Sequence, residues 1–122
     1  MVSCSIAQDW HPESLNSWRG DPDKSGGGVL FNTGSHLLEE LLWVLDGVPL
    51  EVGATVDNRG SDVDINSAVS LSLQCPDSQV TVSIGVCGGS SDLLSDERVN
   101  IWGEDGRIRY TSDRRGNPIS EF

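Results

Sequence analysis

Residues 25–46 read SGGGVLFNTGSHLLEELLWVLD, and this stretch decides the fold because it predicts one long amphipathic helix. At about 100° per residue, the apolar side chains of residues 28–45 gather on one face of that helix. The face consists of Leu30, Gly34, Leu37, Leu38, Leu41, Val44 and Leu45. Gly47 and Pro49 then predict the end of the helix, because glycine favours the position just past a helix and proline cannot continue one. The apolar face requires a core to pack against.

The opposite helix face carries Asn32, Ser35, His36, Glu39, Glu40 and Trp43. Asn32 and His36 are four residues apart, so their side chains lie one turn apart on the same surface. The simplest interpretation is a solvated face. Two features favour a face covered by a partner, a ligand or another domain. One is Trp43 on this face, and the other is the glycine-rich entry, which lets backbone approach a neighbour closely.

Alternation of branched apolar residues with small polar ones predicts a series of strands around this helix. The expected strands cover residues 1–9, 52–56, 69–73, 80–86, 99–101 and 108–110. They would form a two-layer α+β domain: a mostly antiparallel open sheet with the one main helix packed on its apolar face. We expect residues 1–122 to be a single domain with a tail at 112–122. Because the chain begins in what reads as mid-strand, we also expect it to be a fragment.

The other face of the expected sheet is made of small hydroxyl-bearing residues. These are Ser3, Ser5, Thr55, Ser70, Ser72, Thr81 and Ser83. A solvated sheet face usually carries lysine and glutamate, and their scarcity here favours close approach of a second flat sheet. We therefore expect a homodimer formed sheet against sheet through this face. A solvated Ser/Thr face is the alternative.

Composition excludes several classes of function. The chain has 19 acidic and 8 basic residues and a formal net charge of −11, so nucleic acid and anionic membranes are poor partners. No apolar run approaches the roughly 20 residues needed to span a bilayer. Three cysteines without C-x-x-C spacing and only two histidines predict neither a disulfide framework nor a metal site. We expect a cytoplasmic, reducing environment. Cys4 and Cys75, in or at the end of expected strands, should be small buried or half-buried side chains.

The connection over residues 10–28 is long and rich in Pro, Gly, Asp and Ser. Connections of this length are usually functional or disordered, and its two tryptophans argue against disorder. Trp18 and Arg19 are therefore candidate substrate-binding residues, since arginine can bind a carboxylate or a sugar hydroxyl. A loop merely pinned against the sheet by its tryptophans is an equally good interpretation.

The segment SGGGVLFNTGSH and the later VDNRGSDVD resemble the C-terminal domain of the glucose–fructose oxidoreductase / inositol dehydrogenase / MocA family, over about residues 1–110. The resemblance implies a bacterial two-domain oxidoreductase that uses NAD or NADP. The cofactor and a catalytic lysine would belong to an N-terminal Rossmann domain, which would cover the helix face of Asn32 and His36. No G-x-G-x-x-G follows a strand here, so we assign no cofactor-binding residue and expect no cofactor in this chain.

In the inositol dehydrogenase pattern, an aspartate and a histidine four residues apart meet the substrate hydroxyls, and the resemblance places Asn32 and His36 there. An imidazole that titrates near neutral pH can take or relay the proton of a carbinol as its hydride leaves. Asparagine cannot titrate, so Asn32 would only position a hydroxyl or the imidazole. The expected function is hydride transfer on a sugar, polyol or related hydroxy compound, with this chain inactive alone. The alternative is a freestanding non-catalytic binding or dimerisation module.

Overall fold

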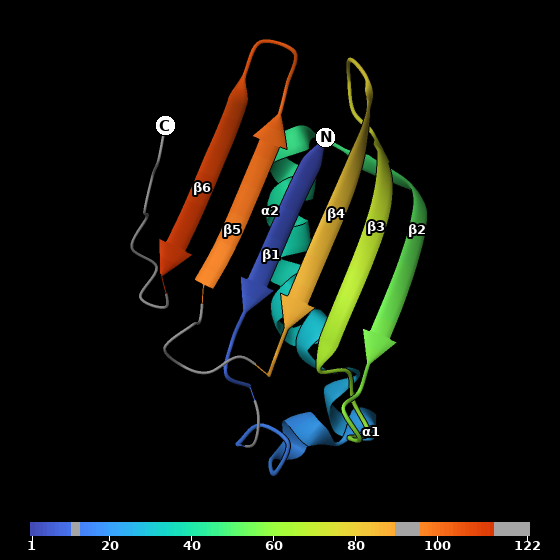
Figure 1. Ribbon diagram of the computed structural model, residues 1–122. Helices are drawn as coiled ribbons and strands as arrows, with labels where there is room; N and C mark the ends of the chain where they lie inside the picture. The colour runs from blue at the N-terminus through green and yellow to red at the C-terminus, as the bar shows by residue number, and fades with distance from the viewer. Residues whose placement is uncertain (11–12, 90–95, 114–122) are drawn as a thin grey trace.

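The computed structural model describes residues 1–10, 13–89 and 96–113, which form one six-stranded sheet with a helix on one face (Figure 1). The strands are β1 (Val2–Ala7), β2 (Val48–Asp57), β3 (Asn66–Gln74), β4 (Gln79–Cys87), β5 (Asp96–Trp102) and β6 (Arg107–Asp113). Their order across the sheet is β2-β3-β4-β1-β5-β6. Only β1 and β4 pair in parallel, and the other neighbours are antiparallel. The α+β, mostly antiparallel open sheet predicted from the sequence is confirmed.

Strand boundaries differ from the predicted ones mainly at the edges of the sheet. β2 begins at Val48 rather than at residue 52, and its register shifts between Pro49 and Glu51. Pro49 is tolerated there because β2 is an edge strand, in which a missing backbone N–H leaves no neighbour unpaired. β6 extends to Asp113, two residues into the stretch predicted as a tail. The rest of that predicted tail, residues 114–122, lies outside the described residues.

The helix predicted over residues 28–45 forms in two parts. A π-helical turn, η2 (Leu30–Gly34), continues directly into α2 (Ser35–Leu45). The left-handed residue that ends α2 is Asp46, with φ 46°, and not Gly47 as glycine's usual place predicts. Gly47 is instead constrained by packing, because a Cβ there would lie 3.1 Å from Leu73 Cδ1.

The core lies between α2 and the middle of the sheet, and its buried residues include the alternating positions of β1 and β4: Val2, Cys4, Ile6, Val82, Ile84 and Val86. Leu37 and Leu41 are the buried residues of α2. Val44 was predicted on the buried face but is 60% exposed, whereas Leu42 is half-buried. At 100° per residue, Val44 lies about 90° from the centre of the stripe that the packed leucines form.

Coverage of the apolar face by the helix is incomplete. α2 lies behind the central strands in Figure 1, whereas β2 lies at the edge. Val52 pairs with Leu71 on the helix side of the sheet but is 72% exposed, and every residue of β2 is exposed. One helix is therefore too narrow to cover all six strands.

The Ser/Thr face predicted from alternation is confirmed by the register of the strands. Ser70 lies between Gly53 and Ser83, and Ser83 in turn pairs with Ser3 across the parallel neighbour. In Figure 1 this face is turned toward the viewer, and no described helix covers it. Larger polar side chains lie toward the margins of this face. They include Glu51 on β2, which pairs with Ser72, and Arg98 on β5, which forms an ion pair of 2.6 Å with Asp96.

The expectation of buried cysteines is confirmed for Cys4 and Cys75, while Cys87 is half-buried, and all three thiols are free. Burial, with a smaller contribution from the Glu97 carboxylate, raises the pKa of Cys4 to about 12. The Cys4 thiol therefore stays protonated and behaves as a small apolar side chain.

Candidate functional site

The predicted site residues lie at the end of the sheet where β1 and β4 end (Figure 1). The connection after β1 forms two short helices there, η1 (Trp18–Gly20) and α1 (Pro22–Ser25), and then enters η2. This brings the loop residues Trp18 and Arg19 beside the start of the long helix. The loop predicted as either functional or pinned thus has structure of its own.

Asp64, in the connection between β2 and β3, holds the start of the helix in place. Its carboxylate accepts hydrogen bonds from the N–H groups of Gly28 and Leu30, both at 2.7 Å, and its carbonyl oxygen accepts one from the Val29 N–H at 3.0 Å. These N–H groups have no partner within the helix, and a carboxylate also complements the positive end of the helix dipole. One residue therefore fixes the entry of the helix that carries Asn32 and His36.

The glycines of residues 26–28 are explained by this contact. A Cβ on Gly28 would lie 2.0 Å from the Asp64 carbonyl oxygen, and one on Gly27 would lie 2.8 Å from Phe31 Cβ. The glycine run therefore permits close approach of backbone, as predicted, and the neighbour is another part of this chain. Asp64 is a residue that the sequence patterns did not single out. The sequence signal that could have identified it is an acidic residue between two apolar ones, Val63 and Ile65. Both apolar residues are buried in the structure.

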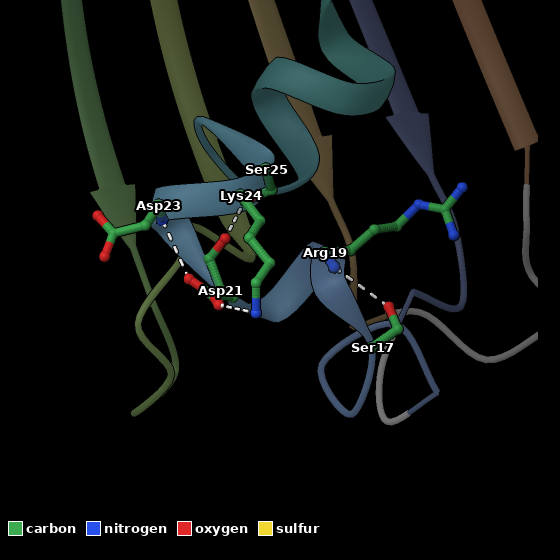
Figure 2. A network of polar contacts seen from close by, with 6 residues as sticks. All are labelled: Ser17, Arg19, Asp21, Asp23, Lys24 and Ser25. Atoms are coloured by element: carbon green, nitrogen blue, oxygen red, sulfur yellow. Dashed lines mark hydrogen bonds and ion pairs between the residues drawn. The ribbon is translucent and has the colours of Figure 1, made fainter.

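Short-range polar contacts shape the loop that presents Trp18 and Arg19 (Figure 2). Asp21 caps α1 by accepting from the Asp23 N–H at 3.1 Å, and it forms an ion pair of 2.6 Å with Lys24. The hydrogen bond from Lys24 lowers the pKa of Asp21. The Ser17 hydroxyl accepts from the Arg19 N–H at 3.2 Å and so caps η1.

The side chains of this loop differ in burial. Trp10 is 6% exposed and packs in the core, so it pins the loop, whereas Trp18 is 53% exposed. The Arg19 guanidinium carbon lies 5.0 Å from the centre of the Trp18 ring, which is a cation–π contact. Trp10 therefore pins the loop against the core, whereas substrate binding by the exposed Trp18 stays a prediction.

A cavity of about 250 Å³ lies between this loop and the start of the helix. Its lining residues are Trp10, Trp18, Arg19, Ser25, Gly27, Phe31 and Asn32. The structure thus brings together three of the four site residues predicted from the sequence. Asn32 belongs to the π-helical turn η2, and such turns in helices are frequent at functional sites.

His36 lies one helical turn beyond Asn32, on α2. Its side chain is exposed, and it is not among the residues that line the cavity. Trp43, further along the same face, is 82% exposed. The face of Asn32 and His36 is therefore open in this chain, and nothing within the described residues packs over Trp43 to any large extent.

Other kinds of site find little support in the described part of the chain. Residues 1–10, 13–89 and 96–113 contain no group of three His, Cys, Asp or Glu side chains placed to hold a metal ion. None of the helices in these ranges has the length and apolar character required to cross a bilayer. The cavity beside Asn32 is where three of the predicted site residues meet.

Comparison with known proteins identifies a matching family model and several solved structures of similar fold. Residues 1–109 match the family model described as the GFO/IDH/MocA C-terminal domain. No curated protein sequence matches the chain significantly. Among solved structures, GenD2 from gentamicin A biosynthesis, in complex with NAD, shares 19% identity at a TM-score of 0.75, over 90% of this chain and 30% of its own.

Two further structures are similar at the same level. A candidate NADPH-dependent oxidoreductase from Desulfitobacterium hafniense shares 18% identity at a TM-score of 0.73, over 92% of this chain and 31% of its own. An oxidoreductase domain protein from Kribbella flavida shares 16% identity at a TM-score of 0.72, over 95% of this chain and 37% of its own. The chain spans about a third of the length of these proteins, and at such identities the likeness shows the fold alone.

Proposed function

This chain belongs to the GFO/IDH/MocA C-terminal domain family, and on that premise we propose that it forms the substrate-binding part of an NAD(P)-dependent oxidoreductase. The substrate would be a sugar, a polyol or a related hydroxy compound. The observation that carries the proposal is the cavity that Asn32 shares with Trp18 and Arg19, one helical turn from His36. A polar helix face beside an aromatic-lined cavity suits a ligand that offers both hydroxyls and apolar ring faces.

The cofactor would be held elsewhere in the full-length protein. A cavity of about 250 Å³ is smaller than the roughly 300–1,000 Å³ typical of sites for drug-sized ligands, so it suits a single ring and not a dinucleotide. The similar structures are about three times longer than this chain, and one of them is in complex with NAD. We propose that a separate nucleotide-binding domain covers the open helix face of Asn32 and His36, and that the 122 residues alone have no turnover.

The chemistry assigned to this chain is positioning and proton transfer. Oxidation of a carbinol carbon requires that its hydroxyl proton leave as the hydride passes to NAD(P). The imidazole of His36 can accept or relay that proton, directly or with a lysine of the other domain. The Asn32 amide can donate and accept hydrogen bonds but cannot titrate, so its role is to orient a substrate hydroxyl.

The test is turnover of NAD(P) by the full-length protein with a panel of sugars and polyols. His36→Ala should reduce kcat by about 10²–10⁴-fold with little change in cofactor affinity, the range typical of general acid–base catalysis. Glu39→Ala, an exposed residue on the same helix face, is the matched control and should leave kcat unchanged. An unchanged kcat in His36→Ala would show that the helix face has only a structural role.

The rival function is a non-catalytic binding or dimerisation module, and one observation favours it. Asn32 stands where the oxidoreductase pattern has an acid, and an amide removes one titrating group from the site. If the full-length protein binds a sugar or polyol but never turns over NAD(P), the module is the better description. Asn32→Asp should then fail to create activity.

We also propose that the chain forms a homodimer through its Ser/Thr sheet face. The support is an exposed face of small side chains across β2, β3, β4 and β1 that no described helix covers. Sedimentation should show a dimer for the full-length protein and a monomer for Ser70→Arg, because an arginine in the middle of the face would prevent close approach. Ser78→Arg, in the exposed turn between β3 and β4, is the control and should stay dimeric.

A further inference from the structure

We propose that the cavity between Trp18 and Asn32 binds an anionic hydroxy compound, such as a sugar acid or a sugar phosphate, and that Arg19 binds its anionic group. The inference narrows the substrate class of the proposed function and rests on it for the site. Binding to the cavity can nevertheless be measured without turnover. The argument has three steps: the state of the Arg19 guanidinium, the charge of the cavity, and its size and shape.

Arg19 has acids close by in sequence but no ion pair with any described carboxylate. Asp21 is engaged by Lys24 at 2.6 Å, and Asp23 lies in the same short helix α1. The Arg19 side chain instead extends away from both acids (Figure 2), and its guanidinium lies 5.0 Å from the centre of the Trp18 ring. Stacking on an aromatic ring fixes the plane of a guanidinium and leaves its N–H groups free to donate.

The cavity is cationic although the chain is strongly acidic. Among the seven described residues that line it, Arg19 alone carries a charge, and the others are aromatic, small or neutral polar. The chain has 19 acidic and only 8 basic residues, so a cavity wall with one cation and no acid is unusual for this protein. Arg19 is half-buried and lines the cavity. A guanidinium at a cavity wall is matched by a carboxylate or phosphate, which can accept two parallel hydrogen bonds.

The other lining residues suit the rest of such a ligand. The rings of Trp18 and Phe31 offer apolar surface to the carbon face of a sugar ring, and both are more than half exposed in this chain. Asn32, on the helix side, can exchange hydrogen bonds with ring hydroxyls. A volume of about 250 Å³ leaves room for one ring and its anionic substituent. The anion at Arg19 would thereby orient the hydroxyls toward Asn32 and the helix face of His36.

The experiment is calorimetric titration of the full-length protein with glucuronate, glucose 6-phosphate and glucose. We expect at least one anionic probe to bind ten-fold or more tightly than glucose. Arg19→Gln should abolish that preference, and Arg19→Lys should keep part of it because a point charge remains. Lys24→Gln, which removes the neighbouring exposed cation, should leave the preference intact.

Each outcome has a definite meaning. Tighter binding of glucuronate identifies a carboxylate as the anion, and tighter binding of glucose 6-phosphate identifies a phosphate; both support the inference. Equal affinity for charged and neutral probes, a preference that survives Arg19→Gln, or no binding of either anion at 10 mM (about a tenfold excess over a Kd of 1 mM) overturns it. Turnover of neutral sugars alone would refute this inference and leave the proposed function standing. Arg19-dependent binding of an anion without any NAD(P) turnover would support this inference and refute the proposed function.

Discussion

Replacing Asp64 with alanine should loosen the start of the long helix, and the structure allows an estimate of the cost. The substitution removes two hydrogen bonds of 2.7 Å from a carboxylate to the N–H groups of Gly28 and Leu30. Hydrogen bonds to charged groups contribute about 1.5–3 kcal/mol each to the free energy of unfolding. A partly exposed site regains part of this from water, and removing a helix cap typically costs about 0.5–2 kcal/mol of stability. We therefore expect Asp64→Ala to lower the free energy of unfolding by about 2–4 kcal/mol.

The amide of Asp64→Asn can still accept one hydrogen bond, so we expect about half of that loss. The matched control is Asp62→Ala, an exposed acid in the same connection, which should change stability by less than about 0.5 kcal/mol. The most direct assay is amide hydrogen exchange of the full-length protein, because the Gly28 and Leu30 amides report the local opening free energy. Denaturant unfolding gives the global effect.

The reasoning also predicts a functional consequence. If Asp64 sets the position of residues 27–32, then Asp64→Ala should weaken ligand binding in the cavity beside Asn32, and Asp62→Ala should not. The account is refuted if Asp64→Ala costs no more than the control, or if the Gly28 and Leu30 amides keep their protection. In that case packing of the helix on the sheet would suffice to hold its start.

The remaining predictions concern the glycine run and a half-buried acid, Glu97. Gly28→Ala should lower Tm in thermal unfolding more than Gly106→Ala does. A Cβ on residue 28 would lie 2.0 Å from the Asp64 carbonyl oxygen, whereas a Cβ on residue 106 would have no atom within 4 Å. Burial, and secondly the Glu40 carboxylate, raise the pKa of Glu97 above 4.5. The Glu97 carboxyl therefore binds its proton more tightly in the folded state than in the unfolded state. Above its folded pKa the ionised carboxylate lowers the free energy of unfolding, and this penalty disappears as pH falls toward 4.5. Glu97→Gln should therefore raise Tm at pH 7 and reduce the gain in Tm between pH 7 and 5, and an unchanged pH profile would contradict this.

Several features of the molecule follow from local patterns in the sequence. Apolar residues at helical spacing predicted a helix over residues 28–45, which forms as η2 and α2. Period-two alternation predicted every described strand and the Ser/Thr face of the sheet. These patterns are reliable because side-chain direction depends only on the repeat of the local backbone. The placement of Asn32 and His36 on one surface is a prediction from the same repeat.

The sequence by itself therefore determined the elements and which face of each is apolar, while the tertiary structure alone decided how they meet. β1 is inserted between β4 and β5, Asp64 reaches the helix start from 34–36 residues away, and Arg19 joins Asn32 across one cavity. Leu42 packs against the core and Val44 is 60% exposed, because packing against the sheet decides which stripe of α2 is buried. Such contacts join groups distant in the chain, and no local repeat encodes the distances between them.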